Sequence, residues 1–586
     1  MRRIFVCALA IASQIVLISC GGLEKPQSEP YYAGTAPPRK QEFRWSNGRM
    51  PKNLDPALAA VPPETDVIRA VYEGLTELDT RTLEPMPAVA EKWTVTEDLR
   101  TWTFQLRNNA RWSNGRSVTA EDFVRSWKRV EEFGAAATNR ELMANIVGFE
   151  IRKREAVPAP SDLIPNTNVE RGPQSPFPMP TRSPSTTIEN SNVRSGFGPE
   201  PIFFGVSAPD ALTLRVSLTV PDKDFPKLVA HPMFRPVFDD GSGLATRSVT
   251  KDVVTNGAFR VASIDPDGIM LLRSENYWNR EAVKLESAKL VSSKNAEQVL
   301  AAYRAGEIDA ITNAEFEPLA LKLLEPFEDF RRRTHAALNF YEINHGKSPF
   351  DDRRVREALA ISIERERLTE GEMDGLTTPA LAFLPFSGDP TTRIVHDKER
   401  AADLLEEAGF ANGSGFPVVR LVVNRNDTQL RVARAVARMW KQSLNINTEV
   451  VVKEPADLEI ARTAGDYDLI RRNVVYASAD ELMSILTIFK PAEAPSRTPG
   501  AAPQTAGGVE ARPAPSPSDD RETPPPAGGV DSTMTEANAV YELWAIPLYF
   551  PTSYSLVKPY VDGFEMNSLD APLLTQVSID SNWQPK

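Results

Sequence analysis

The chain has few residues of the kinds that hold metals or form disulfides. Of its 586 residues only two are cysteine, Cys7 and Cys20. The four histidines are His231, His335, His345 and His396, and no two of them stand at the spacing of metal ligands. Without a cysteine or histidine pair a transition-metal site is not expected, and we predict no cofactor and no metal.

Catalytic motifs are missing as well. The sequence has no G-x-S-x-G nucleophile elbow and no H-E-x-x-H zinc motif. A hydrolase needs a nucleophile beside a base, so we do not expect an enzyme. The net charge of −12 also argues against nucleic acid or an anionic membrane surface as a partner, because both are bound through clustered Lys and Arg.

The N-terminus carries the first positive signal. Met1-Arg2-Arg3 precede the uncharged apolar run Ile4–Ile18, which is typical of a secretion signal. A membrane-spanning helix needs roughly 20 residues, so a transmembrane anchor is the weaker interpretation. The run ends in Leu17-Ile18-Ser19-Cys20, which resembles the lipobox of bacterial lipoproteins. The alternative is an ordinary signal peptide with an incidental cysteine.

The lipobox resemblance implies a signal peptide over residues 1–19 that is cut before Cys20, and a diacylglycerol on the Cys20 thiol. The mature chain then has one cysteine and no internal disulfide. Residues 20–42 are rich in Gly, Pro and polar residues, which predicts a flexible tether. The protein is expected in the cell envelope, outside the cytoplasm, attached to the membrane only through lipid.

Two further segments stand apart in composition. Residues 157–201 and 491–530 are rich in proline, and such composition buries too little apolar surface to offset its ordering entropy. We predict disordered or loosely extended loops, inserted at the surface or serving as ligands for a partner.

The remaining chain shows mixed helix and strand patterns, and its length predicts two or more domains. Residues 101–107 and 212–218 alternate as half-buried strands, and Thr119 with Asp122 predicts a capped helix start. Another helix is expected from Asp351 to a stop at Gly371. Residues 418–423, 430–444 and 449–452 read as strand, helix and strand, which indicates a βαβ unit and a partly parallel sheet.

At these segments the sequence resembles a known family. The run WTFQLRNNARWSNGRSVTAEDFVRSWKRV (102–130) is similar to the peptide-binding solute-binding proteins of bacterial ABC importers, the oligopeptide and dipeptide class. INHGKSPFDDRRVREALAISIERERL (343–368), YDLIRRNVVY (467–476) and AIPLYFPTSYSLVKPYVDGF (545–564) follow in the family's order. The resemblance covers most of the chain from Phe43 to Phe564.

The resemblance implies an α/β, two-lobed periplasmic-binding-protein-like fold with an extra domain and mixed sheets. A ligand would be enclosed between the lobes. The implied division is lobe I over 43–72, the extra domain over 73–200 with the insertion 157–201, lobe I again over 201–275, lobe II over 276–540 with the segment 491–530, and a C-terminal return to lobe I over 541–586.

It also implies site residues. In the motif Tyr467-Asp-Leu-Ile-Arg471, Arg471 matches an arginine that in the family faces the peptide carboxylate; a structural ion pair with Asp468 or a neighbour is the alternative. The residues expected around the ligand are Arg471, Asn473, Val475, Tyr476, Ala477 and Asp480, with Val61 and Pro62 opposite.

Two departures from the family affect this site. Where many members carry an aspartate that pairs with the peptide's amino terminus, this chain has Ala477, or Ser478 with a one-residue gap, and the nearest acid is Asp480. Pro62 has no N–H to offer a ligand. Recognition of a free amino terminus is therefore in doubt.

The function implied is that of a monomeric, lipid-anchored binding protein that captures peptides or a related ligand and delivers it to an ABC permease. The alternative is a derived member that acts without transport, as a surface sensor, a chaperone-like binder or a scaffold.

The lipobox yields a first prediction. Replacing Cys20→Ser removes the thiol that carries the lipid, so the protein should leave the membrane fraction and should incorporate no labelled palmitate. Two or more acyl chains give stable attachment, whereas one is marginal. Membrane-bound Cys20→Ser protein, or a parent chain without palmitate, would contradict lipidation at this residue.

Overall fold

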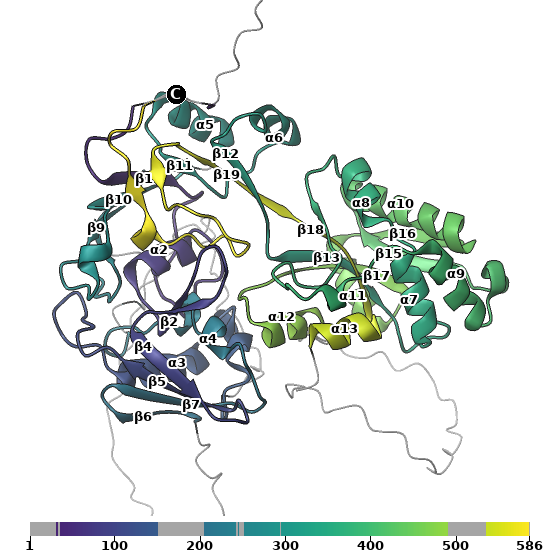
Figure 1. Ribbon diagram of the computed structural model, residues 1–586, viewed down its shortest axis with the longest axis horizontal. Coiled ribbons are helices and arrows are strands. Elements are labelled where there is room, and N and C mark those ends of the chain that lie inside the picture. The colour runs from purple at the N-terminus through teal and green to yellow at the C-terminus, as the bar shows by residue number, and fades with distance from the viewer. Residues whose placement is uncertain are drawn as a thin grey trace, which may run out of the picture.

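The computed structural model describes residues 31–32, 36–149, 204–241, 244, 251–293, 295–489 and 535–584. The predicted signal peptide 1–19, the lipidation site Cys20 and the Pro-rich segments 157–201 and 491–530 lie outside these residues, as does most of the tether 20–42. Within them the chain forms three main sheets, arranged as two lobes and an extra domain beside the first lobe (Figure 1). No helix of the described residues has the length and apolar character to cross a membrane.

Lobe I is built on a seven-stranded mixed sheet. In spatial order its strands are β12 (Phe330–Thr334), β19 (Thr552–Val557), β11 (Ala310–Ile311), β1 (Glu42–Ser46), β10 (Ser287–Val291), β9 (Gly268–Arg273) and β8 (Phe259–Asp265). Parallel pairing joins β1 to both β10 and β11. The lobe also contains α2 (Glu64–Val71), α5 (Ala296–Ala305), α6 (Pro318–Leu324) and the short pair β20 (Val561–Asp562) and β21 (Ser578–Ile579).

The extra domain has a four-stranded antiparallel sheet in the order β4 (Ala90–Val95), β5 (Thr101–Leu106), β7 (Thr213–Ser217) and β6 (Val206–Asp210). It also holds β2 (Thr76–Leu78), β3 (Pro85–Pro87), α3 (Ala120–Phe133) and α4 (Phe225–Leu228). The capping box predicted at Thr119 and Asp122 is confirmed, with reciprocal hydrogen bonds at the start of α3.

Lobe II has a six-stranded mixed sheet in the order β14 (Thr378–Pro379), β18 (Ala545–Phe550), β13 (Ala337–Ile343), β17 (Leu469–Val475), β15 (Val419–Asn424) and β16 (Thr448–Lys453). Its helices are α7 (Arg353–Ile361), α8 (Arg365–Arg367), α9 (Lys398–Glu407), α10 (Asp427–Leu444), α11 (Pro455–Ala464), α12 (Glu481–Ile488) and α13 (Glu536–Glu542).

The predicted βαβ unit is confirmed in lobe II. β15 and β16 pair in parallel over their whole length, and α10 connects them. The helix starts at an Asn426 cap that accepts from the Gln429 N–H, and Val432, Val436, Met439 and Trp440 are buried on one of its faces. Trp440 on that face donates from its indole N–H to the Leu359 carbonyl at 2.9 Å, which joins α10 to α7.

Other boundaries differ from prediction. The helix expected to run to Gly371 ends at Ile361. There the buried Arg365 guanidinium donates to the Ala360 carbonyl at 3.1 Å and so satisfies one acceptor of the helix end.

The division into lobes that the resemblance implied differs from the structure at three places, because strand pairing joins segments that are distant in the chain. Residues 206–217 pair into the extra domain's sheet and do not return to lobe I. Residues 287–334, predicted in lobe II, supply β10, β11 and β12 to the sheet of lobe I. β18, predicted in lobe I, pairs with β13 of lobe II.

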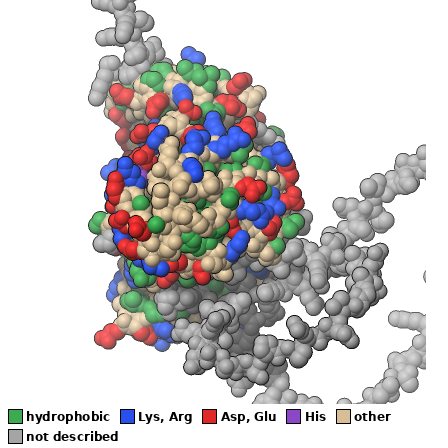
Figure 2. All heavy atoms as spheres, turned by 90° about the vertical axis from the view of Figure 1, so that its right-hand side faces the viewer, with side chains coloured by type: hydrophobic (Ala, Val, Ile, Leu, Met, Phe, Trp, Pro, Cys, Tyr) green, Lys and Arg blue, Asp and Glu red, His purple; other side chains and the backbone are tan. Residues whose placement is uncertain are grey.

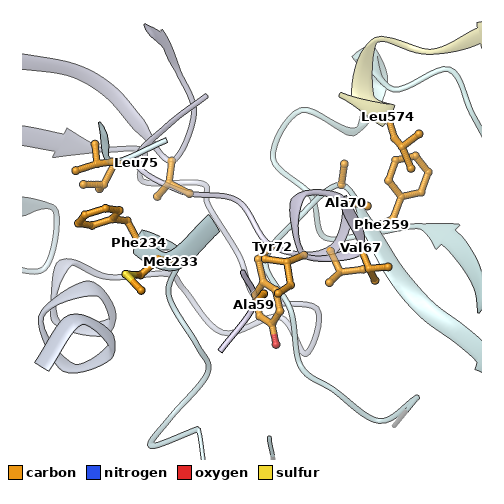
Figure 3. Packing of buried hydrophobic residues seen from close by; sticks show 14 of the residues in the cluster. Ala59, Val67, Ala70, Tyr72, Leu75, Met233, Phe234, Phe259 and Leu574 are labelled. Atoms are coloured by element: carbon orange, nitrogen blue, oxygen red, sulfur yellow. The ribbon is translucent and has the colours of Figure 1, made fainter. Parts of the chain in front are cut away.

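Lobe I and the extra domain share one apolar core. Figure 3 shows Tyr72 between two groups of side chains, with Leu75, Met233 and Phe234 on one side and Val67, Ala70, Phe259 and Leu574 on the other. The continuity of this core means that the extra domain and lobe I pack as one unit, while lobe II has apolar clusters of its own.

Gly257 lies where the chain enters β8 against the end of α2, and this contact yields a second prediction. A Cβ there would stand 2.5 Å from the Val71 carbonyl carbon. Gly257→Ala should therefore lower the free energy of unfolding by ~1–3 kcal/mol, as overpacking does. Calorimetry checks this against Gly388→Ala, where a Cβ meets nothing within 4 Å and the change should stay within about 1 kcal/mol. Equal stability of the two variants would contradict the close contact.

Candidate ligand-binding site

Strand β17 of lobe II has one edge that is only partly paired. On one side β13 pairs with β17 along its whole length, from Leu469 to Val475, whereas on the other side β15 pairs only with Leu469 and Ile470. Beyond that point residues 471–475 have no strand partner on this side within the described residues. An open strand edge offers backbone N–H and C=O groups to an extended chain, so this edge can accept a peptide backbone.

Arg471 begins the open edge and has no anionic partner among the described residues. Its Nη2 donates to Asn339 Oδ1 at 2.5 Å, and its Nε is buried without a hydrogen-bond partner. Burial lowers the pKa of Arg471, against the smaller opposing influence of Tyr549 and Tyr341. A guanidinium in this state gains from any carboxylate that reaches it.

The ion pair that the sequence left open for Arg471 is not formed. Asp468 instead pairs with Lys347 and accepts from the backbone N–H of Arg420. The adjacent Arg472 differs from Arg471, because it donates to Glu342 at 2.6 Å and to the Ile488 carbonyl at 2.7 Å. Of the two neighbouring arginines, only Arg471 is left to bind an anion.

Tyr341 adds a second uncommitted donor that sequence reasoning missed. It is the register partner of Arg471 on β13, it is fully buried, and its hydroxyl has no hydrogen-bond partner among the described residues. Tyr549 of the neighbouring strand β18, by contrast, is already bonded to Gln429 at 2.8 Å. Only the pairing register could have revealed Tyr341, since it lies 130 residues from Arg471 by number and in a separate strand.

The other predicted residues of this segment divide into two groups. Asn473 is exposed and Val475 is 55% exposed, so both lie open along the edge. Tyr476 is buried and donates from its hydroxyl to the Phe383 carbonyl at 2.7 Å. Ala477 lines a small cavity against lobe I.

Asp480 is fully buried at the start of α12. Its Oδ1 accepts from the Met483 N–H at 2.6 Å. It therefore acts as a helix cap, and its carboxylate does not face an open surface.

Lobe I contributes a separate polar cavity of about 330 Å³ at the carboxyl ends of β1 and β11. Pro62 lines it, whereas Val61 is 52% exposed and is absent from the lining. Asn47, Arg49 and Asn313 also line it, and the sequence did not single them out. Ligands commonly bind at the carboxyl ends of parallel strands. The polar run Ser46-Asn47 could have signalled such an end only if a strand had been predicted before it.

The charge around this cavity is already balanced in part. Arg49 Nη1 binds Glu64 Oε1 at 2.7 Å, and Glu64 is buried. Burial raises the pKa of the nearby Asp66 to about 7, opposed by Arg69 and Asn47. Within the described residues no group of three or more His, Cys, Asp or Glu is placed to hold a metal ion.

Comparison with known proteins identifies the family of the chain. Residues 84–496 match the model of the bacterial extracellular solute-binding proteins, family 5, middle region. The chain is 28% identical over 454 residues to the periplasmic oligopeptide-binding protein OppA of Salmonella typhimurium, covering 75% of each chain. It is 28% identical over 471 residues to the periplasmic murein peptide-binding protein MppA of Escherichia coli, covering 78% of this chain and 79% of that relative. It is also 25% identical over 477 residues to the probable deoxycholate-binding periplasmic protein YgiS of Escherichia coli, covering 78% and 81%.

Solved structures share the fold. The unliganded open form of the murein tripeptide-binding protein MppA superposes with a TM-score of 0.69 at 23% identity, covering 93% of this chain and 98% of that chain. A complex of Haemophilus influenzae OppA with the peptide RPPGFSPFR gives a TM-score of 0.53 at 24% identity, covering 93% and 99%.

These relatives are binding proteins and not enzymes, and the family match spans most of the chain. The two-lobed architecture predicted from the sequence is confirmed. The chain belongs to the bacterial extracellular solute-binding proteins of family 5, the peptide-binding class that serves ABC importers.

Proposed function

We propose that this chain is a lipid-anchored extracytoplasmic receptor that captures a peptide, or a related ligand with a carboxylate, between its two lobes and delivers it to an ABC permease. The family match and the relatives named for oligopeptide and murein peptide binding support the ligand class. The lipobox-like sequence before Cys20 supports the anchor.

The observation that carries the proposal is the half-buried Arg471 without an anionic partner beside an open strand edge. A peptide that adds to β17 would form hydrogen bonds between its own backbone and that of residues 471–475. The peptide backbone groups are the same in every peptide sequence. Its terminal carboxylate would accept from the guanidinium in a charge-assisted pair. Such a receptor binds what peptides share and tolerates different side chains.

The opposite end of the ligand has no matching charge in the predicted segment. Ala477 stands where an acid would pair with an ammonium group, and the carboxyl group of Asp480 is buried in the cap of α12. We therefore propose that the ligand's carboxylate is recognised and that its amino group is not. Deoxycholate, for which one relative is named, likewise has a carboxylate and no amine.

The face of lobe II seen in Figure 2 has Lys and Arg interspersed with Asp and Glu over its described surface. Mixed charge of this kind offers no continuous basic track for a phosphate backbone. A small-molecule ligand and a protein partner, the permease, therefore fit this surface better than nucleic acid does.

Removing Arg471 tests the carboxylate contact. Arg471→Met should weaken binding by ~2–5 kcal/mol, because the ligand carboxylate would be buried without its partner. Calorimetry should use a peptide recovered by mass spectrometry from purified protein, in free-acid and amidated forms. In the variant the two forms should bind alike, whereas the parent should prefer the acid.

Arg400 provides the matched control, since it lies on α9 and pairs with the exposed Glu407 of the same helix. Arg400→Met should leave affinity unchanged within about 0.5 kcal/mol. A parent protein that binds acid and amide equally would refute the role of Arg471.

The absence of an acid at Ala477 predicts how the protein treats the amino terminus of the ligand. An N-acetylated peptide should bind within about 0.5 kcal/mol of the free-amine peptide, because residues 471–480 hold no carboxylate that is free to pair with an ammonium group. Calorimetry with the matched peptides measures the difference. A preference for the free amine of more than about tenfold, or 1.4 kcal/mol, would show that an acid elsewhere reaches the ligand.

A further inference from the structure

Two carboxyl groups from different parts of the molecule meet at the contact between lobe II and the extra domain. Asp480 stands at the start of α12 in lobe II, and Asp222 lies in the loop between β7 and α4. Their side chains are within hydrogen-bonding reach of each other. Asp480 is 0% exposed and Asp222 is 4% exposed, so the pair is shielded from water.

The hydrogen bonds of the two groups show that a donor is missing between them. Asp480 Oδ1 accepts from the Met483 N–H at 2.6 Å, and Asp222 Oδ1 accepts from the Asp224 N–H at 2.8 Å. The Oδ2 atom of each is buried without a donor among the described residues. Ionised carboxylates only accept hydrogen bonds, so two buried carboxyl groups within hydrogen-bonding reach of each other are compatible only if one carries a proton.

The surrounding charges do not supply a counter-ion for the buried pair. Lys223 pairs with Glu481 at 2.9 Å and is largely exposed. Glu481 also accepts from the backbone N–H of Glu536 on α13. The remaining charged or titratable side chains on elements packed against this contact are Asp224, Lys227, Glu84, Arg69, Glu77 and His231.

Several of these groups are committed to one another or do not titrate near neutral pH. Lys227 binds both Glu84 and Asp224. Burial, with Arg69 and Arg235, lowers the pKa of His231 to about 3, so this residue stays neutral. Burial raises the pKa of Asp222 to about 6 and that of Asp480 well above its ordinary value, and the proximity of the two groups adds to the rise for Asp480. Two carboxyl groups this close share a proton.

We propose that Asp222 and Asp480 form a proton-dependent contact that holds lobe II against the extra domain in the arrangement described here. An apolar contact accompanies it, because Met483 of α12 is buried in the core shared by lobe I and the extra domain. When the shared proton leaves, two like charges remain at a dry interface, and the contact weakens.

The sign of the effect follows from proton linkage. The joined state binds one proton that the separated state, with ordinary aspartates of pKa about 3.9, does not hold at higher pH. The contact is therefore at full strength below about pH 4 and weakens as pH rises through the raised pKa of the pair. Between about pH 4 and the raised pKa of the pair, the ratio of joined to separated molecules should fall about tenfold per pH unit.

The proposal concerns regulation of the lobes and rests on the proposed function only in assuming that they move. It is tested without ligand, so its failure would leave the role of Arg471 untouched. Spin labels on cysteines that replace the exposed residues Glu121 of α3 and Arg431 of α10 report the distance between the extra domain and lobe II. They are introduced into the chain from residue 20 onward with Cys20→Ser, which has no thiol of its own.

The parent should show mainly the joined distance at about pH 5 and a second, broader population at about pH 8. Asp480→Asn should show the joined distance at both values, because its amide still caps α12 and donates permanently to Asp222. Asp222→Asn provides the same test from the other side of the contact. Glu481→Gln, which removes only the exposed ion pair, should keep the pH dependence of the parent.

His335 also titrates between the lobes and must be separated from the pair. Its Nδ1 lies 2.9 Å from Asp570 Oδ2, and although burial acts in the opposite direction, the hydrogen bond to Asp570 raises the pKa of His335. This residue is present in every variant above. A distance in the parent that does not change with pH, or an unchanged pH dependence in both asparagine variants, would overturn the proposal.

Discussion

A single backbone hydrogen bond connects the two places where the chain passes between the sheets. The His335 N–H donates to the Pro551 carbonyl at 2.8 Å. His335 and Ala336 alone separate β12 in lobe I from β13 in lobe II, and Pro551 alone separates β18 from β19. Because both crossings are this short and lie side by side, rotation of one lobe against the other is confined to these few residues. The rest of each lobe can move only as a body around them.

Local patterns in the sequence predicted the elements well, and non-local pairing explains the errors. The βαβ unit of lobe II and the capped start of α3 depend on residues close together in the chain, so periodicity and capping chemistry identify them. Strands β10, β11 and β12 were predicted in the wrong lobe, because β10 and β11 pair with β1, more than 200 residues earlier, and β12 pairs with β19, more than 200 residues later. No local pattern states which sheet a strand joins.

The same limit applies to the site. The family resemblance identified Arg471 as a site residue. That Arg471 has no anionic partner among the described residues depends on Asp468 pairing with Lys347, a contact across 121 residues. Tyr341 becomes relevant only through the register of β13 against β17. Asp480 was expected near the ligand. It is instead buried beside Asp222, because α12 docks on the extra domain, and no residue near Asp480 in the sequence indicates that docking.

The open strand edge and the contact between lobes belong to one continuous stretch of chain. The edge ends at Val475, and Asp480 begins α12 after a short buried turn in which the Ser484 hydroxyl donates to the Ser478 carbonyl at 3.2 Å. A ligand that adds to β17 therefore binds a strand whose continuation holds Asp480, one member of the carboxyl pair. If a ligand at this edge changes the strength of the contact between lobe II and the extra domain, linkage requires the contact to change the affinity for the ligand by the same free energy.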